Sequence, residues 1–109
     1  MVGGEWIGVD FDGTLAEYGT PNAGRPIMPM VERVKAWLAG GHKVRIVTAK
    51  AAFPDMVAEV EAWCERHLGK RLPVTNCKDF GMLELWDDRC VQVRTNTGEI
   101  VSNGGNKQW

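Results

Sequence analysis

The chain has 109 residues, of which 44% are hydrophobic and 25% are charged, as in an ordinary compact domain. No apolar run approaches the ~20 residues needed to cross a bilayer, and the N-terminus lacks the basic and apolar regions of a secretion signal, so we expect a cytoplasmic protein with no membrane partner. The formal net charge of -1 and the lack of a basic run give no signature of nucleic-acid binding, which leaves nucleic acid only as a candidate substrate.

The first predicted element is a buried strand that ends in acidic residues. Residues 6–9 are apolar and are followed by Asp10, Asp12 and a glycine. In an open α/β sheet, ligands bind at the carboxyl ends of the strands, so two carboxylates at this position favour a divalent-cation site and a nucleophile. For this D-x-D pair taken alone, a solvated turn is the competing interpretation, and the rest of the chain decides between them.

Helices and strands alternate after a polar loop that is rich in glycine and proline. Apolar residues at helical spacing predict helices over residues 29–39 and 54–68, with a strand over residues 43–47 between them. Pro54 stands at the favoured first turn of the second helix, and glycines follow both helices. Thr48 follows the strand, so we expect its hydroxyl at the same edge of the sheet as the first two acids.

The last third of the chain predicts three short strands and a turn. The strands are expected over residues 73–75, 83–86 and 90–94, and the last of them turns back into residues 99–101 as a C-terminal β-hairpin. The polar, glycine-rich residues 102–109 predict a flexible tail. Residues 1–101 therefore form a single predicted domain.

Polar residues also mark the ends of the later strands. Lys78 lies in the polar stretch after the third strand, and Asp87 and Asp88 directly follow the fourth strand. The order acid pair, hydroxyl, lysine, acid pair, together with the sequences DFDGT and WDD, resembles the haloacid dehalogenase-like (HAD) superfamily of phosphoryl-transfer enzymes over about residues 5–95. The resemblance is closest to small capless members, many of them encoded by bacteriophages. It implies a three-layer, Rossmann-like α/β fold with a small, mainly parallel sheet.

The spacing of these motifs leaves no room for a cap domain. A loop, a helix and a strand fill the chain between Thr14 and Thr48, and a helix takes about half of the chain between Thr48 and Lys78. Because an uncapped site admits bulky groups, we expect a phosphomonoester such as a phosphorylated polynucleotide end or a phosphoprotein as substrate. The sequence does not identify that substrate, and it leaves a homo-oligomer open.

The resemblance assigns each motif residue a role in a Mg²⁺-dependent phosphatase. The residue at the position of Asp10 attacks phosphorus and forms an aspartyl-phosphate, and the residue at Asp12 gives its backbone carbonyl to Mg²⁺ and acts as general acid and base. Thr48 would hydrogen-bond the phosphoryl group. Asp88 is expected to be the direct metal ligand, with Asp87 as the partner of the lysine or of a metal-bound water, and the reverse order stays open.

The lysine is the motif whose position departs from the family pattern. The family places a helix between the third and fourth strands, with the lysine near its start, whereas about seven residues separate Thr75 from Leu83 here. This connection has to cover about three strand spacings of ~4.8 Å each, which predicts a vestigial third strand. The resemblance favours Lys78 as the positive charge beside the nucleophile, and Lys50 is the alternative.

Two alternatives to a phosphatase remain open. A non-catalytic, phosphatase-like binding module would keep the acids without turnover, and a receiver-like phosphoacceptor also combines acids, threonine and lysine around Mg²⁺. The complete set of motif residues argues against the binding module, and the DFDGT sequence argues against the phosphoacceptor.

Overall fold

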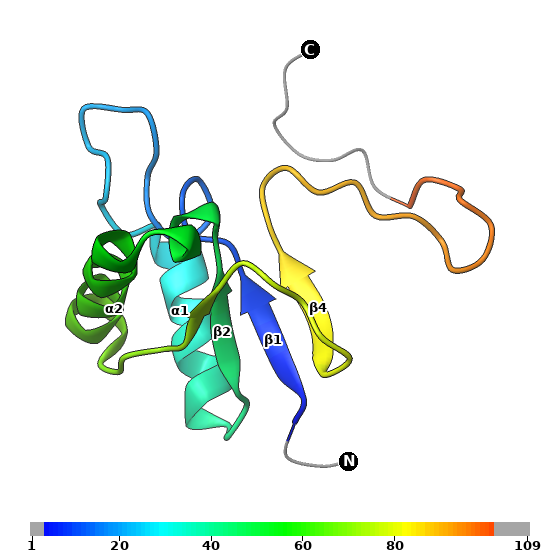
Figure 1. The fold of residues 1–109 in the computed structure, drawn as a ribbon, viewed down its shortest axis with the longest axis horizontal. Helices are drawn as coiled ribbons and strands as arrows, with labels where there is room; N and C mark the ends of the chain where they lie inside the picture. Colours follow the sequence, from blue (N-terminus) through cyan, green and yellow to red (C-terminus); the bar gives the residue numbers. More distant parts are fainter. Residues whose placement is uncertain (1–3, 102–109) are drawn as a thin grey trace.

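The computed structural model describes residues 4–101 as an α/β domain built on a four-stranded parallel sheet. The elements in chain order are β1 (Trp6–Val9), α1 (Met28–Ala39), β2 (Val44–Val47), the 3-10 helix η1 (Ala49–Ala52), α2 (Pro54–Leu68), β3 (Val74–Thr75) and β4 (Met82–Trp86). The strands lie in the order β3-β2-β1-β4, and all neighbours are parallel (Figure 1). The predicted α/β class, both helices and the first four strands are confirmed, and β3 is indeed short, with two residues.

Both helices lie on the same face of the sheet (Figure 1). Each crossover moves one strand further in the same direction, from β1 to β2 and from β2 to β3, and right-handed crossovers then place both helices on one side. The main core lies between the sheet and these helices. Val31 of α1, Val60 of α2 and Ile46 of β2 meet there, each with 1% exposure or less.

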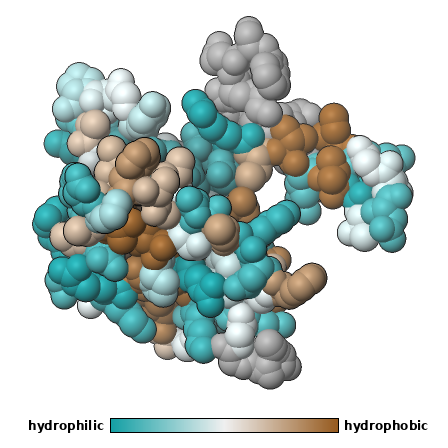
Figure 2. All heavy atoms as spheres, in the orientation of Figure 1, coloured by the Kyte–Doolittle hydropathy of each residue, from teal (hydrophilic) through white to brown (hydrophobic). Residues whose placement is uncertain are grey.

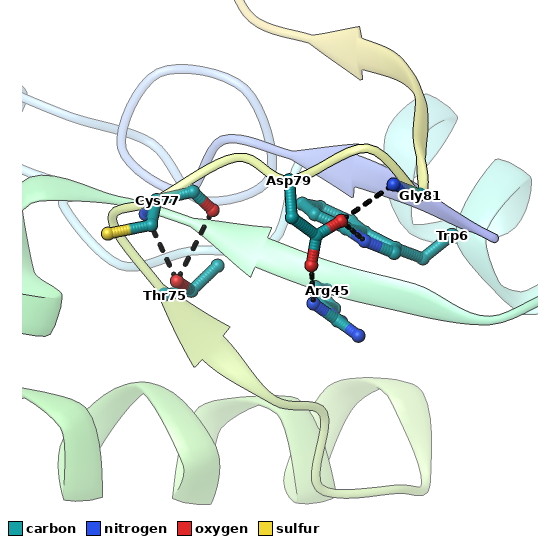
Figure 3. Close-up of polar contacts among 6 residues, drawn as sticks. All are labelled: Trp6, Arg45, Thr75, Cys77, Asp79 and Gly81. Atoms are coloured by element: carbon teal, nitrogen blue, oxygen red, sulfur yellow. Dashed lines mark hydrogen bonds and ion pairs between the residues drawn. The ribbon is translucent and has the colours of Figure 1, made fainter. Parts of the chain in front are cut away.

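The opposite face of the sheet has no helix within residues 4–101 and is crossed by residues 76–81, which connect β3 to β4 (Figures 1 and 3). We call these residues the crossing segment. The Asp79 carboxylate anchors it by accepting hydrogen bonds from Trp6 Nε1 at 2.8 Å and from Arg45 Nη1 at 3.2 Å. The Trp6 hydrogen bond is the main reason why the pKa of Asp79 lies below its usual value. The third layer that the family resemblance implies is therefore reduced to this segment, under which Trp6 is only 1% exposed.

Residues 90–101, which we call the arm, extend away from the sheet after β4 (Figure 1). A single antiparallel bridge joins Val93 to Ile100, and Asn96 and Gly98 adopt positive φ in the turn between them. The predicted turn is present, but among the described residues neither the fifth strand nor its hairpin partner forms a strand. The reason is that two isolated antiparallel segments are only marginally stable in water. Val93 and Ile100 are accordingly 55% and 64% exposed. Figure 2 shows hydrophobic side chains on the surface in the region of the arm, at the upper right.

None of the helices within residues 4–101 is long and apolar enough to cross a membrane. The predicted flexible tail, residues 102–109, lies outside the described residues.

Candidate active site

Three carboxylates meet at the carboxyl edge of the sheet. Asp10 follows β1, whereas Asp87 and Asp88 follow β4, the direct neighbour of β1. Because these strands are parallel, both end at the same edge, and the Asp10 N–H donates to the Trp86 carbonyl at 2.9 Å. One carboxylate oxygen of each acid lies within 4.8 Å of the other two. The structure thus brings together three of the predicted site residues, which we call the acid cluster.

The acid cluster carries crowded negative charge. The pKa of Asp10 is raised to about 7, first by burial and then by the charges of Asp87 and, to a smaller degree, Asp88. A bound cation would relieve this crowding because it offsets the charge of all three carboxylates. Donor sets made only of oxygen suit a hard cation such as Mg²⁺. The cluster therefore has the donors and the excess charge of a divalent-cation site.

Gly13 and Thr14 join the two halves of the cluster, although the sequence predicted no role for either of them. The Thr14 hydroxyl lies 3.3 Å from Asp10 Oδ2 and 3.4 Å from Asp88 Oδ1, and it accepts a hydrogen bond from the Asp88 N–H at 3.0 Å. Gly13 has a φ of +87°, and a Cβ at this position would lie 2.6 Å from Asp88 Oδ2. The signal was present in the sequence, since these two residues complete the DFDGT motif.

Thr48 lies at the same edge of the sheet, directly after β2. It is only 6% exposed, and its Oγ1 accepts a hydrogen bond from the Lys50 N–H at 3.2 Å, which caps η1. A cavity of about 500 Å³ is lined by Asp10, Thr48, Asn76 and Asp87, among other residues. The predicted hydroxyl group therefore borders the same cavity as acids from β1 and β4.

The two candidate lysines differ in their contacts with the motif acids, and the one that the family resemblance favours, Lys78, has no hydrogen bond or ion pair with them among the described residues. Lys50 Nζ lies 3.3 Å from Asp12 Oδ1 and 5.1 Å from the centroid of the Phe11 ring. Lys78 is exposed and has no hydrogen bond or ion pair with any residue in the range 4–101. The physical reason is that the crossing segment continues from β3 without forming a helix that would begin at the site. Of the two lysines, it is Lys50 that lies against a motif acid.

Comparisons with known proteins support the fold. No protein-family model matches the chain, and no curated protein matches it. Among solved structures, the chain is similar to that of a conserved protein from Bacteroides thetaiotaomicron, with a TM-score of 0.62 and 26% sequence identity. The similarity covers 78% of this chain and 76% of that chain. It supports the α/β fold, and the description of that protein names no activity.

Proposed function

We propose that this protein is a Mg²⁺-dependent phosphatase of the HAD-like type, which hydrolyses phosphomonoesters through an aspartyl-phosphate on Asp10. The observation that carries the proposal is the meeting of Asp10, Asp87 and Asp88 within 4.8 Å, beside a cavity that the Thr48 hydroxyl also lines. A carboxylate nucleophile, further carboxylates for a cation and a hydroxyl donor are the groups that phosphoryl transfer from a dianion requires.

The acid cluster fits a magnesium ion as its resident metal. Asp10, Asp88 and the backbone carbonyl of Asp12 would hold the ion, and Asp87 would face it from the same cluster. Bound there, Mg²⁺ would supply the positive charge that lets a carboxylate approach a phosphate dianion. We assign Asp88 as the direct ligand because Thr14 fixes it next to Asp10, whereas Asp87 lines the cavity in which the substrate would bind.

The side chains at the sheet edge divide the chemistry between them. A carboxylate oxygen of Asp10 attacks phosphorus, the bond from phosphorus to the leaving oxygen breaks, and Asp12 donates a proton to that oxygen. Asp12 then takes a proton from the water that attacks the aspartyl-phosphate, which releases inorganic phosphate and restores Asp10. Because the Thr48 oxygen accepts from the Lys50 N–H, its own hydrogen is left to donate to a phosphoryl oxygen.

Lys50 is the lysine whose position suits a role in the proposed reaction. Its ammonium lies 3.3 Å from Asp12, the residue that would protonate the leaving oxygen, so it would stabilise negative charge that develops there. The family resemblance assigns this role to Lys78, which has no ion pair with Asp10 or Asp12 in the described part of the chain. We therefore propose Lys50 as the active-site cation.

The open site favours a bulky substrate. Between Thr14 and Thr48 the chain contains a loop, α1 and β2, and between Thr48 and Lys78 it contains η1, α2 and β3. We propose on this basis that no cap closes over the acid cluster, and that the substrate is a phosphomonoester such as a phosphorylated polynucleotide end or a phosphoprotein.

Release of phosphate from p-nitrophenyl phosphate tests the reaction class. We expect turnover that requires Mg²⁺, stops in EDTA and is lost in Asp10→Asn. Asp55→Asn, which removes an exposed acid of the first turn of α2 that belongs to none of the motifs, is the matched control and should stay active. Mg²⁺ binding without phosphate release from any phosphomonoester would instead indicate a non-catalytic binding module, and a stable phosphoprotein after acetyl phosphate would indicate a phosphoacceptor.

A further inference from the structure

A second cavity lies next to the candidate active site, between α2 and the loop that follows β1. Its volume is about 330 Å³, and its lining includes Phe11, Lys50, Glu59, Trp63 and Arg66. We call it the side cavity. Phe11 and Trp63 form its apolar floor, since they are 5% and 6% exposed and their rings pack edge to face with centroids 5.1 Å apart. Small-molecule sites combine such an apolar floor with a few polar groups at the wall.

The loop wall of the side cavity is held in place by hydrogen bonds. Trp63 Nε1 donates to the Gly24 carbonyl at 2.6 Å, and the Gly24 N–H donates to the Glu17 carbonyl at 2.8 Å. These bonds tie the loop to α2, and Figure 1 shows the loop at the upper left, close to that helix. A cavity whose walls are already bonded to each other costs less to order when a ligand binds.

Lys50 connects the side cavity to the active site. Its ammonium lies 3.3 Å from Asp12 and 5.1 Å from the centroid of the Phe11 ring in the cavity floor. In the proposed reaction Asp12 protonates the leaving oxygen, so the leaving alcohol lies beside Asp12 and Lys50. The larger cavity, by contrast, is lined by Asp10 and Thr48 on the side of the phosphoryl group. Because Lys50 both pairs with Asp12 and lines the side cavity, a leaving group beside these two residues would extend toward that cavity.

Arg66 supplies a cation at the wall of the side cavity. It follows Trp63 by three positions on α2, which places both side chains on one side of the helix. It is exposed and has no hydrogen bond or ion pair with any residue that the structure describes. Arg71, just beyond the same helix, instead pairs with Glu61 and Glu65. Exposed arginines are common, but this one is informative because it lines the same cavity as Lys50, which pairs with the proposed general acid Asp12.

We propose that the side cavity binds a second phosphate group, which the leaving alcohol of the substrate carries. The inference rests on the proposed function and narrows the substrate class to phosphomonoesters whose alcohol bears another phosphate. Arg66 would bind that phosphate through its paired N–H donors, and Lys50 would lie between the two phosphates. Phe11 and Trp63 would contact the carbon skeleton that joins them. Glu59, which lines the same cavity, opposes binding of the second phosphate.

Pairs of substrates that differ only in the second phosphate test this proposal. Phosphate release is measured for adenosine 3′-monophosphate against adenosine 3′,5′-bisphosphate, and for glucose 1-phosphate against glucose 1,6-bisphosphate. We expect kcat/KM to be about tenfold higher for the bisphosphate than for the monophosphate in at least one pair. This is the effect expected from one additional charge-assisted contact. A preference in the first pair alone would point to a nucleotide or polynucleotide end, and in the second pair alone to a sugar.

Variants of the cavity wall assign the preference to particular residues. Arg66→Gln should raise KM for the preferred bisphosphate about tenfold and leave kcat and the monophosphate unchanged. Glu59→Gln should lower the same KM, because it removes the opposing carboxylate. Lys35→Gln, which removes an exposed cation of α1 that is unpaired among the described residues, is the matched control and should change neither substrate.

The outcomes separate this proposal from the proposed function. Phosphate release with equal kcat/KM for both members of each pair, or an equal loss for both members in Arg66→Gln, would overturn the second-phosphate site and leave the phosphatase standing. Isothermal titration of the same four compounds into Asp10→Asn with Mg²⁺ measures binding without turnover. Tighter binding of a bisphosphate that Arg66→Gln abolishes, with no phosphate release by the wild type, would support the side cavity and overturn the phosphatase.

Discussion

The acid cluster lies at the carboxyl edge of the sheet, whereas the segment that carries Lys78 crosses the face of the sheet from the end of β3 to the start of β4. The fold positions the two in different ways. Asp10, Asp87 and Asp88 directly follow two paired strands, so the register of β1 and β4 fixes where they lie. Lys78 lies on the crossing segment, which is anchored at Asp79 on the face of the sheet and not at the site. The pairing of two strands thus fixes the position of the residues that directly follow them. The connection between β3 and β4 contains no helix, and it does not bring Lys78 to the acid cluster.

Removal of one charge from the acid cluster should have the largest effect. Asp10→Asn keeps the shape of the side chain but removes the nucleophile, so kcat with p-nitrophenyl phosphate should fall by roughly a thousandfold or more, about 4 kcal/mol of transition-state stabilisation. Circular dichroism should show the same fold. A variant that keeps more than about a tenth of the wild-type rate, a barrier change below ~1.4 kcal/mol, would show that Asp10 is not the nucleophile.

The two lysines test the other side of the comparison. Lys50→Met should reduce kcat/KM by about a hundredfold because it removes a preorganised charge next to Asp12, and Lys78→Met should cost less than about tenfold. Steady-state kinetics on both variants, with Mg²⁺ affinity measured in parallel, give the answer. The reverse order of effects would mean that the crossing segment brings Lys78 to the site when substrate binds, as the family resemblance implies.

The raised pKa of Asp10 should make the stability of the metal-free protein depend on pH. The carboxyl titrates near 3.8 in the unfolded chain and at about 7 in the folded protein, so between these values the folded state binds more protons. The free energy of unfolding should therefore fall as the pH rises from about 4 to about 7, by about 2 kcal/mol once solvent screening is included. Urea unfolding in EDTA measures this change.

Asp10→Asn is the control for this pH dependence because it removes the titrating group and leaves the other carboxyls in place. Mg²⁺ at pH above 7 should restore the lost stability of the wild type. If the free energy of unfolding changed with pH in the same way for the wild type and the variant, the pKa of Asp10 would not be raised in the folded protein.

A pair of glycines isolates the contact that positions Asp88. Both Gly13 and Gly19 have positive φ, but an added Cβ would lie 2.6 Å from Asp88 Oδ2 at Gly13, whereas it would meet nothing within 4 Å at Gly19. Gly19→Ala should cost about 1 kcal/mol of stability from its backbone conformation alone. Gly13→Ala should cost about 1 kcal/mol more and also weaken Mg²⁺ binding. Equal effects of both changes on Mg²⁺ affinity would argue against a fixed Asp88.

Release of the crossing segment should have the smallest effect on activity. Asp79→Ala removes the hydrogen bonds to Trp6 and Arg45, so the Tm should fall and tryptophan fluorescence should change as Trp6 becomes exposed. We expect no measurable change in kcat, because none of the three carboxylates of the acid cluster is bonded to Asp79. A marked change in kcat would show that the path of the crossing segment matters to the reaction, and would favour a role for Lys78.

The parts of the molecule that were predictable from sequence depend on local rules. The prolines and glycines at the ends of α1 and α2 set the limits of both helices, and the acids that follow apolar runs predicted the residues of the acid cluster. The position of Lys78 was not predictable, because it depends on the hydrogen bond between Trp6 and Asp79, which are 73 residues apart. Apolar residues in the arm also satisfied the local pattern of a strand, but a strand needs a neighbour, and no local pattern supplies one.

The pairing of β4 with β1 holds the candidate metal site together, so separation of these two strands would also break up the site. Within residues 4–101 β4 pairs with β1 alone, and the Trp6 N–H donates to the Gly81 carbonyl at 2.9 Å just before β4 begins. If β4 opens as one cooperative unit, Asp87 and Asp88 leave Asp10 together and the candidate metal site is lost in one event. A cation bound across the two strands would oppose that opening by mass action, so Mg²⁺ should slow amide hydrogen exchange along the β1–β4 ladder more than elsewhere in the sheet.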